Sequence, residues 1–392
     1  SLLMLSGISR RFLTAAFYSR NFSRPKPFLS AKPKSSSKSS TMDLKEFLVS
    51  QKDAVPNHMV VGNRAGDADS IISAITLAYI DSVYGGNSMT PIVSISKKDL
   101  QTQRPEVLFL FRTLDLESAM DSLRFIDDPV VTATGNQKLL TLVDHNRAEE
   151  AFANFKVLEI LDHHYDEQQH LATCVNRQIA FEGDQSLAAS TCTLVAERLK
   201  SLKAPKYHST IATLLLATIL LDSVNMIPQA GKGTPRDASA IADLLKNTDW
   251  STSSKEAVSA WWDSSEESKP QTTRIFESLQ AAKFDPHFWR GLSVQDALRL
   301  DYKSFSVAKH TIGASSILMP MEGFLQKQDV VQEIVLYMET ASVDFLAILF
   351  FYTETGEGRR QLILCGIQDS ETGKLVDEIT KSLQKDGTLG LN

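Results

Sequence analysis

The sequence predicts an α/β protein, in which a mainly parallel sheet flanked by helices is followed by a second, smaller α+β domain. Three observations lead to this fold class. Short apolar runs alternate with helical patterns from residue 43 to about residue 225, and strands separated by helices favour a parallel sheet covered on both faces. The alternation stops in 228–290, which is rich in Ser, Thr, Glu and Lys and reads as helices and a connector without chemistry. A new apolar pattern at 341–366 predicts two strands joined by a Gly-rich turn.

The elements of the first domain are expected in a regular order. Short apolar runs predict the strands, and longer segments with periodic apolar residues predict the helices. The expected strands are HMVVGN (58–63), PIVSIS (91–96), LLTLVDH (139–145) and VLEILDHH (157–164), and the expected helices lie at 69–84, 188–202 and 209–223.

Length and composition indicate a globular protein with two domains. The chain has 392 residues, 43% of them apolar, which is more than one hydrophobic core usually holds. The longest aliphatic run, IATLLLATILL at 211–221, is too short to cross a bilayer, so we expect a buried helix and no membrane partner. Three cysteines without close spacing, Cys174, Cys192 and Cys365, argue against a disulfide framework or a thiolate zinc site.

Residues 1–41 differ in composition from the rest of the chain. They contain eight basic residues, eleven serines and no acidic residue, which is typical of a mitochondrial presequence. The sequence therefore predicts a mitochondrial matrix protein. The alternative is an untranslated or disordered leader, with Met42 as the start of a cytoplasmic protein. In both cases residues 1–41 are expected to lie outside the fold, with the first domain at 42–270 and the second at 285–392.

The charge of the predicted domains excludes a general affinity for polyanions. Without the leader, 33 basic residues face 47 acidic ones, and the formal net charge changes from −6 to −14. A polyanionic ligand would therefore need bound metals and a local basic patch. The sequence also lacks a basic stripe with interleaved aromatic residues, so we expect no nucleic-acid partner.

Polar residues follow three of the predicted strands at the point where each strand ends. GNRAGDADS (62–70), DHN (144–146) and DHH (162–164) occupy these positions, and the carboxyl ends of parallel strands are where ligands collect. Taken one at a time, the aspartates could equally cap helices or sit in turns. Their common location favours a metal site instead. The candidate ligands are Asp67, Asp69, Asp144, His163 and Asp222.

The donor set indicates which ions such a site would hold. Clustered carboxylates repel one another unless cations neutralise them. Oxygen donors mixed with imidazole suit Mg²⁺, Mn²⁺ or Co²⁺ better than structural zinc. Two such ions, about 3.5–4 Å apart, could activate a bridging water and clamp a phosphoryl oxygen for in-line attack.

In this order, the strings NRAGDADS, LVDHN, LDHH and LLDSVNM resemble the four motifs of the DHH phosphoesterase superfamily. Within it the chain most resembles the fungal exopolyphosphatases, which have a similar length and a second domain with a segment like DYKSF…IGASSI (301–317). The likeness covers about residues 45–390. It implies an exopolyphosphatase, a hydrolase that releases orthophosphate from the end of linear inorganic polyphosphate.

The resemblance also implies a role for each candidate residue. Asp67 and Asp69 would each hold one metal, Asp144 and Asp222 would bridge or support both, and His163 would complete the second site. His164 would contact the substrate and serve as proton donor to the leaving oxygen, as its counterpart does in the manganese-dependent pyrophosphatases. Asp162 would orient both histidines.

Substrate contacts are also expected from the second domain. Its GRRQ string at 358–361 resembles the basic motif that binds terminal phosphate in the pyrophosphatases, and the adjacent Lys309 and His310 precede IGASSI, where those enzymes place a lysine. The alternative for Arg359 and Arg360 is a solvated hairpin turn. In the first domain, the cluster of Lys97, Lys98 and Arg104 is expected to be a solvated face; the alternative is that it extends a channel for longer chains.

Two departures from the pyrophosphatases bear on the substrate. Asn63 stands where those enzymes have histidine, which favours polyphosphate over pyrophosphate and predicts a neutral amide oxygen at the first metal. His145, in contrast, resembles the pyrophosphatases and the prune proteins. The alternative function is therefore a prune-like or pyrophosphatase-like phosphoesterase, in part a scaffold. Prune proteins depart from an intact DHH string, whereas this chain retains it.

Overall fold

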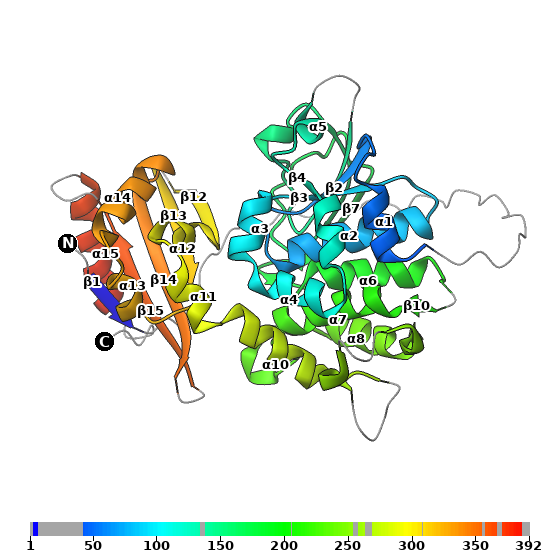
Figure 1. The fold of residues 1–392 in the computed structure, drawn as a ribbon. Coiled ribbons are helices and arrows are strands. Elements are labelled where there is room, and N and C mark those ends of the chain that lie inside the picture. Colours follow the sequence, from blue (N-terminus) through cyan, green and yellow to red (C-terminus); the bar gives the residue numbers. More distant parts are fainter. Residues whose placement is uncertain are drawn as a thin grey trace, which may run out of the picture.

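The protein contains two domains that lie side by side, each built around its own sheet (Figure 1). The computed structural model describes residues 3–6, 42–133, 138–204, 206–253, 258–262, 269–307, 309–354, 357–366 and 371–385. Both domains combine a sheet with helices, and the predicted fold class is confirmed.

The first domain has a six-stranded sheet in the order β4-β3-β2-β5-β6-β7, and its strand pairs are all parallel. The strands are β2 (His58–Val61), β3 (Thr90–Val93), β4 (Arg124–Phe125), β5 (Leu139–Val143), β6 (Lys156–Asp162) and β7 (Asn176–Ile179). Side chains that alternate along β2 enter two cores: Val60 packs into the larger one, and Met59 and Val61 pack into a smaller one on the opposite face.

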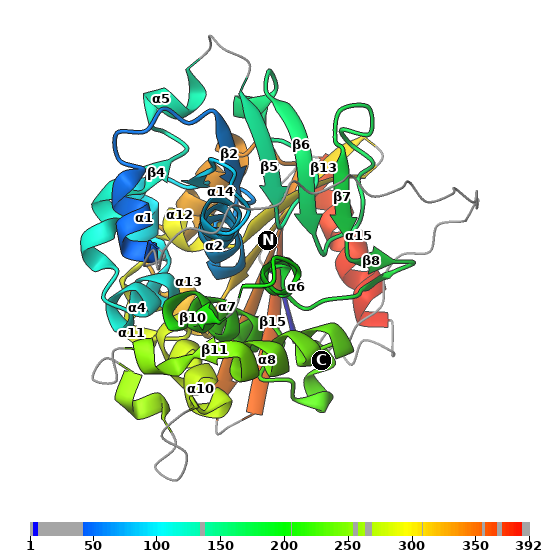
Figure 2. The same ribbon diagram turned by 90° about the vertical axis from the view of Figure 1, so that its right-hand side faces the viewer.

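Helices surround this sheet (Figures 1 and 2). They are α1 (Leu44–Ser50), α2 (Ala68–Val83), α3 (Lys97–Gln103), α4 (Pro105–Thr113), α5 (Pro129–Thr132), α6 (Thr191–Ser201), α7 (Ser209–Asp222), α8 (Pro235–Asn247) and α10 (Thr272–Lys283). Short 3₁₀ helices lie at Glu117–Ser122, Glu150–Phe152, Pro228–Ala230, Trp250–Thr252 and Ser259–Trp261, and two small strand pairs join β8 (Phe181–Glu182) to β9 (Gln185–Ser186) and β10 (Tyr207–His208) to β11 (Thr248–Asp249).

The aliphatic run at 211–221 forms most of α7, as predicted. Nearly all of its residues are buried because α7 lies between α2, α6 and α10 in the larger core. In the described part of the chain, no helix combines the length and the apolar character that a membrane span needs.

The second domain has a mixed five-stranded sheet in the order β1-β15-β14-β13-β12. Its elements are α11 (Pro286–Gly291), α12 (Val294–Arg299), β12 (Tyr302–Val307), β13 (His310–Ile317), α13 (Met321–Leu325), α14 (Val330–Thr340), β14 (Phe345–Glu354), β15 (Glu357–Cys365) and α15 (Glu371–Lys385). The antiparallel pair β14 and β15 is the hairpin predicted at 341–366. Residues of α12, α13 and α14 cover one face of the sheet and form a separate core with Leu346, Ile348 and Ile363.

Residues 3–6 depart from the expectation that the whole leader lies outside the fold. They form β1 (Leu3–Ser6), which pairs antiparallel with β15. The pairing extends the sheet beyond β15 and supplies hydrogen-bond partners to the edge of that strand. The other residues of the predicted leader lie outside the described part of the chain.

Helix α10 occupies the stretch between the two predicted domain ranges. Its apolar residues Ile275, Phe276 and Leu279 belong to the larger core of the first domain. The helix ends at Lys283, directly before the second domain begins. The region that the sequence reads as a connector therefore brings a charged side chain to the junction of the two domains.

Candidate metal centre

The predicted site residues gather at the carboxyl ends of β2, β5 and β6, which are neighbours in the first sheet. The loop after β2 carries Asn63 and Asp67, and Asp69 lies in the first turn of α2, whereas Asp144 follows β5 and His163 follows β6. The fifth predicted ligand, Asp222, is the last residue of α7. The strand order therefore explains how motifs far apart in the sequence meet at one edge.

Asp144 is held from two sides by side chains of the first motif. Its Oδ2 accepts hydrogen bonds from Ser70 Oγ at 2.6 Å and from Asn63 Nδ2 at 2.7 Å, which leaves Oδ1 directed toward His163 Nε2, 3.3 Å away. The residue is buried and has a φ of 64°, a left-handed conformation that is uncommon outside glycine and often occurs at functional sites.

Asp69 directs its carboxylate from the first turn of α2 to the N-terminus of α6. One of its oxygens accepts from Ser190 Oγ at 2.6 Å and Cys192 N at 2.9 Å, and the other accepts from Thr191 N at 2.7 Å. A carboxylate is stabilised there by unpaired N–H groups and by the helix dipole. The second oxygen also lies 3.6 Å from His163 Nε2. The capping role that the sequence left open, at the helix that follows, belongs to Asp67 on α2. Asp69 bonds to the start of a different helix and also has a place in the cluster.

His163 has one ring nitrogen fixed by the backbone and the other facing carboxylates. Its Nδ1 lies 2.9 Å from the carbonyl oxygen of Ala188. Because a carbonyl only accepts, Nδ1 carries a proton, and Nε2 is the nitrogen that can hold a metal. Burial lowers the pKa of His163, but the hydrogen bond with Asp144 and the charge of Asp69 outweigh burial and raise the pKa to about 10.

His164 faces a different partner. Its Nδ1 lies 2.8 Å from Asp162 Oδ1, and Asp162 Oδ2 accepts from Asn146 Nδ2 at 2.6 Å. Burial raises the pKa of Asp162, but the bond from His164 outweighs burial and the pKa falls to about 2. Burial lowers the pKa of His164, and Asp162 raises it above its ordinary value. Asp162 thus orients His164 alone, and the expectation that it orients both histidines is wrong. His163 is oriented by the carbonyl of Ala188 instead.

Asp222 supplies a buried oxygen without a protein partner. Its Oδ2 accepts no hydrogen bond, which is unusual for a buried carboxylate. Burial and the charges of Asp69 and Asp67 raise its pKa well above the ordinary value. Beyond Ser223, the residues Val224, Asn225 and Met226 are all left-handed, so the chain turns sharply as it leaves the site.

The arrangement fits divalent cations. Burial, followed by the charge of Asp69, raises the pKa of Asp144 to about 7, although the hydrogen bond with His163 opposes the shift; repulsion between carboxylates therefore contributes to it. Ligand atoms of Asp144, His163 and His164 lie within 4.8 Å of one another. Cations held by Asp69, Asp144 and His163, with Asp67 and the unpaired oxygen of Asp222 beside them, would relieve that repulsion.

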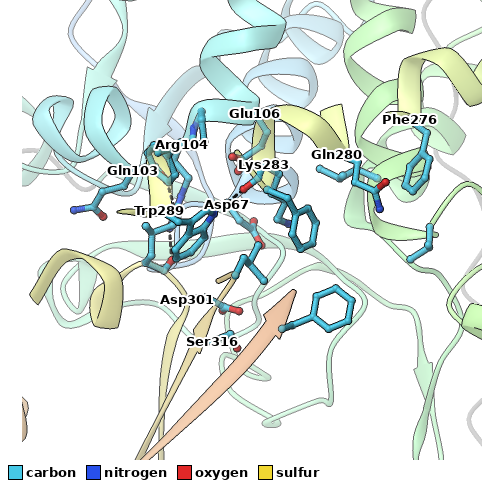
Figure 3. A pocket seen from close by; sticks show the side chains of 18 residues that line it. Asp67, Gln103, Arg104, Glu106, Phe276, Gln280, Lys283, Trp289, Asp301 and Ser316 are labelled. Atoms are coloured by element: carbon cyan, nitrogen blue, oxygen red, sulfur yellow. Dashed lines mark hydrogen bonds between the residues drawn. The ribbon is translucent and has the colours of Figure 1, made fainter. Parts of the chain in front are cut away.

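A cavity of about 270 Å³ lies between the two domains beside Asp67 (Figure 3). Arg104 and Lys283 line it from the first domain, and Asp301 and Ser316 line it from the second. Aromatic, aliphatic and polar residues complete the wall. The aromatic residues are Phe276, Phe284, Phe288, Trp289 and Phe351, and Glu106 is an acidic one.

Three basic residues lower the pKa of Asp67, and none of them was expected at the site from the sequence. Burial raises the pKa of Asp67, but Lys283, a hydrogen bond from the Ser70 amide, Arg104 and Lys303 outweigh burial and lower it. The expectation that 228–290 carries no chemistry is therefore wrong for Lys283. Lys303 lies within the DYKSF string, and a basic residue in that motif is the sequence signal that could have identified it as a site residue.

Strand register separates the four predicted substrate contacts of the second domain. Arg360 pairs with Phe351, which lines the cavity, and its guanidinium lies 5.7 Å from that ring. Arg359 pairs with Tyr352 and so points to the opposite face of the sheet. His310 lies on the same face as Ser316, six positions along β13, and its ring is 5.2 Å from Phe345.

Lys309 lies in the turn before β13 and is exposed. The structure thus directs Arg360 and His310, but not Arg359, toward the face that bounds the cavity. Both arginines belong to β15 rather than to a turn.

Two expectations for the first domain are wrong. Arg104 is not on a solvated face, since it is 3% exposed and bonded to backbone carbonyls. Asn63 does not offer its amide oxygen to a metal, because that oxygen accepts from the N–H groups of Ala65 at 2.8 Å and Gly66 at 3.3 Å. Its Nδ2 faces Asp144 instead.

Comparisons with known proteins agree with this architecture. Residues 57–219 match the DHH family, N-terminal domain, and residues 277–392 match the DHHA2 domain. Exopolyphosphatase PRUNE1 of Bos taurus is 32% identical over 312 residues, which cover 78% of this chain and 62% of that protein. A manganese-dependent inorganic pyrophosphatase of Methanothrix thermoacetophila is 28% identical over 195 residues, which cover 48% of this chain and 54% of that protein.

A solved structure shares the fold. A Methanococcus jannaschii protein described as a family II inorganic pyrophosphatase superposes with a TM-score of 0.54 at 20% identity, covering 78% of this chain and 87% of that one. The chain spans less than two thirds of the length of the bovine relative. It belongs to the DHH phosphoesterase superfamily, with a DHH domain followed by a DHHA2 domain.

Proposed function

We propose that the protein is a metal-dependent exopolyphosphatase that removes the terminal phosphate of linear inorganic polyphosphate. The observation that carries the proposal is that His163 Nε2 lies within 3.6 Å of both Asp69 and Asp144, next to a histidine that is oriented by its own aspartate. Asp67, another candidate ligand, lines a cavity that has Lys283 on its wall. The superfamily membership and the exopolyphosphatase and pyrophosphatase names of the relatives support the same class of chemistry.

The residues divide the reaction between them. Two divalent cations, Mg²⁺, Mn²⁺ or Co²⁺, would activate water and neutralise phosphoryl charge when bound to Asp67, Asp69, Asp144, His163 and Asp222. His164 holds a proton on the nitrogen bonded to Asp162, and its half-exposed ring can deliver the proton of its other nitrogen to the leaving phosphate oxygen.

The cationic residues of the cavity bind the phosphate chain. Lys283 of the first domain supplies positive charge at the cavity wall, and Lys303 and Arg360 add charge from the second domain. The apposition of the second domain favours a chain end over an internal bond.

The decisive experiment is phosphate release from a panel of substrates with Mg²⁺, Mn²⁺ and Co²⁺ tested separately. Free orthophosphate should appear from linear polyphosphate from the first time points, while chain length falls gradually on gels. Mid-chain cuts that accumulate before free phosphate would contradict an end-specific enzyme. Pyrophosphate and nucleotides in the same panel compare the alternative functions.

A prune-like phosphoesterase that acts on nucleotides is the second candidate. The aromatic residues of the cavity favour this candidate, since aromatic side chains stack on bases, whereas a phosphate chain has no ring on which they could stack. Faster turnover of a nucleotide than of polyphosphate would support this reading.

We also propose a mitochondrial location on the basis of the basic, acid-free composition of residues 1–41. Imaging of fluorescent fusions of the full chain and of residues 42–392 tests the location. Cytoplasmic signal from both fusions would favour the alternative that Met42 begins the functional protein.

A further inference from the structure

Arg104 lies between α3 and α4, at the junction of the two domains. The residue precedes Pro105, which disfavours helical backbone at position 104, and its φ of −126° and ψ of 63° break the two helices apart. The side chain is turned inward and is 3% exposed. An arginine is rarely so buried unless its guanidinium has specific partners.

The guanidinium bonds to carbonyls of three segments. Its Nε donates to Gly66 O at 2.6 Å, and an Nη2 N–H donates to Ala65 O. The other Nη2 N–H donates to Leu300 O at 2.5 Å, and Nη1 donates to Gln103 O at 3.0 Å. Figure 3 shows Arg104 beside Asp67 at the cavity wall.

Two of these segments carry functional residues. Ala65 and Gly66 immediately precede Asp67, and Gly66 is left-handed with a φ of 60°; a Cβ there would lie 2.5 Å from Ile95. The loop is therefore tightly fitted. Leu300 ends α12 of the second domain and directly precedes Asp301 and β12, on which Lys303 lies.

We propose that Arg104 is a positioning residue that couples the placement of the second domain to the loop presenting Asp67. A single planar group with several N–H donors in fixed directions connects both segments, so a shift of the second domain moves the donors that hold the metal loop. The inference deepens the proposed function, since hydrolysis needs the phosphate chain and the metals at a fixed separation.

The first test needs no variant. Coupling between two sites is reciprocal, so Mn²⁺ binding in the first domain should slow amide hydrogen exchange at 301–303 in the second domain of the wild-type protein. The metal alone is the ligand, and no substrate is required. Unchanged exchange at 301–303 on saturation with Mn²⁺ would overturn the proposal, whether or not the protein hydrolyses polyphosphate.

The second test replaces Arg104 with lysine, which keeps the charge but loses the planar set of donors. In Arg104→Lys, amides at 64–67 and 301–303 should exchange faster, and the Mn²⁺ response at 301–303 should disappear. Mn²⁺ affinity and kcat should each fall roughly 10- to 100-fold, the scale for residues that orient metal ligands.

Arg124→Lys is the matched control. Arg124 also donates to backbone carbonyls, those of Lys52 and Ala54, but at the opposite end of the sheet, before β2. The control should keep the wild-type exchange pattern and Mn²⁺ affinity. If Arg104 has a purely structural role, Arg104→Lys should show faster amide exchange throughout the first domain but keep the Mn²⁺ response at 301–303. That result would refute the coupling. If Arg104→Lys does not fold, the wild-type exchange experiment still decides.

Discussion

At the scale of single residues, the site depends on which atom of each side chain is already committed. His163 commits Nδ1 to Ala188, His164 commits Nδ1 to Asp162, and Asn63 commits its oxygen to the loop. The atoms that are left over, above all His163 Nε2 and Asp222 Oδ2, define where a cation fits. Two adjacent histidines of identical chemistry therefore acquire different roles from their hydrogen-bond partners.

The two histidines should separate in a mutational test. His163→Ala removes a nitrogen that faces Asp69 and Asp144, so bound Mn²⁺ should be lost along with activity. His164→Ala should keep the metal and slow turnover about 10²–10⁴-fold, the usual scale for a general acid. Elemental analysis of the purified variants gives the metal content. An empty site in His164→Ala would show that this histidine is a metal ligand. A third variant, Asp144→Asn, should lose bound metal and activity together.

Asn63 offers a test of how Asp144 is held. Asn63→Asp replaces the Nδ2 donor by a second anionic oxygen 2.7 Å from Asp144, so repulsion should weaken Mn²⁺ binding by roughly 10- to 100-fold. Asn63→Ser, which is small and uncharged, should weaken binding less. Calorimetric titration of metal-stripped protein measures both. Equal affinities in the two variants would mean that the charge beside Asp144 has no effect on the site.

At the scale of elements, the alternation of side chains along β15 decides which arginine can reach the cavity. Arg360 is on the face of Phe351, and Arg359 is on the face that the helices of the second domain cover nearer its centre. The two arginines look equivalent in the string GRRQ. Side chains alternate along a strand, however, so neighbouring residues lie on opposite faces of the sheet.

The two arginines form a matched pair of variants. Arg360→Ala should raise KM for polyphosphate several-fold because it removes charge-assisted bonds to phosphate, while Arg359→Ala should leave KM nearly unchanged. Both residues are exposed, so the free energy of unfolding should change by less than about 0.5 kcal/mol in each variant. Steady-state kinetics and thermal melts give the two readouts. A larger KM effect from Arg359→Ala would contradict the register argument.

At the scale of the whole molecule, the two domains have separate cores, and the metal ligands belong to the first domain alone. Arg104, Lys283 and Lys303 meet Asp67 from both sides of the junction. The second domain therefore completes the electrostatics of the site although it contributes no candidate metal ligand.

Metal binding should consequently stabilise one part of the molecule. Mn²⁺ at about 100 times its Kd contributes about 2.7 kcal/mol to the state that binds it, which should raise the Tm of the first domain by roughly 5–10 °C. The unfolding transition of the second domain should move much less. Calorimetry with Mn²⁺ and with a chelator measures both transitions. Asp144→Asn is the control, and an equal shift in that variant would mean that the ion binds elsewhere.

The alternating elements and the buried helix at 211–221 could be predicted from the sequence, because apolar runs and their period are local patterns. The convergence of Asp69, Asp144 and His163 could be predicted as well, because each motif lies where a predicted strand ends. The sequence also determined the superfamily, since four spaced motifs are specific together. Tertiary structure alone decided the places of Lys283, Arg104 and Arg359. Lys283 reaches the site because α10 packs into the first core, Arg104 is enclosed by carbonyls of its own domain and of Leu300 in the other, and the face of Arg359 depends on strand register. Contacts between residues distant in sequence leave no local pattern from which they could be predicted.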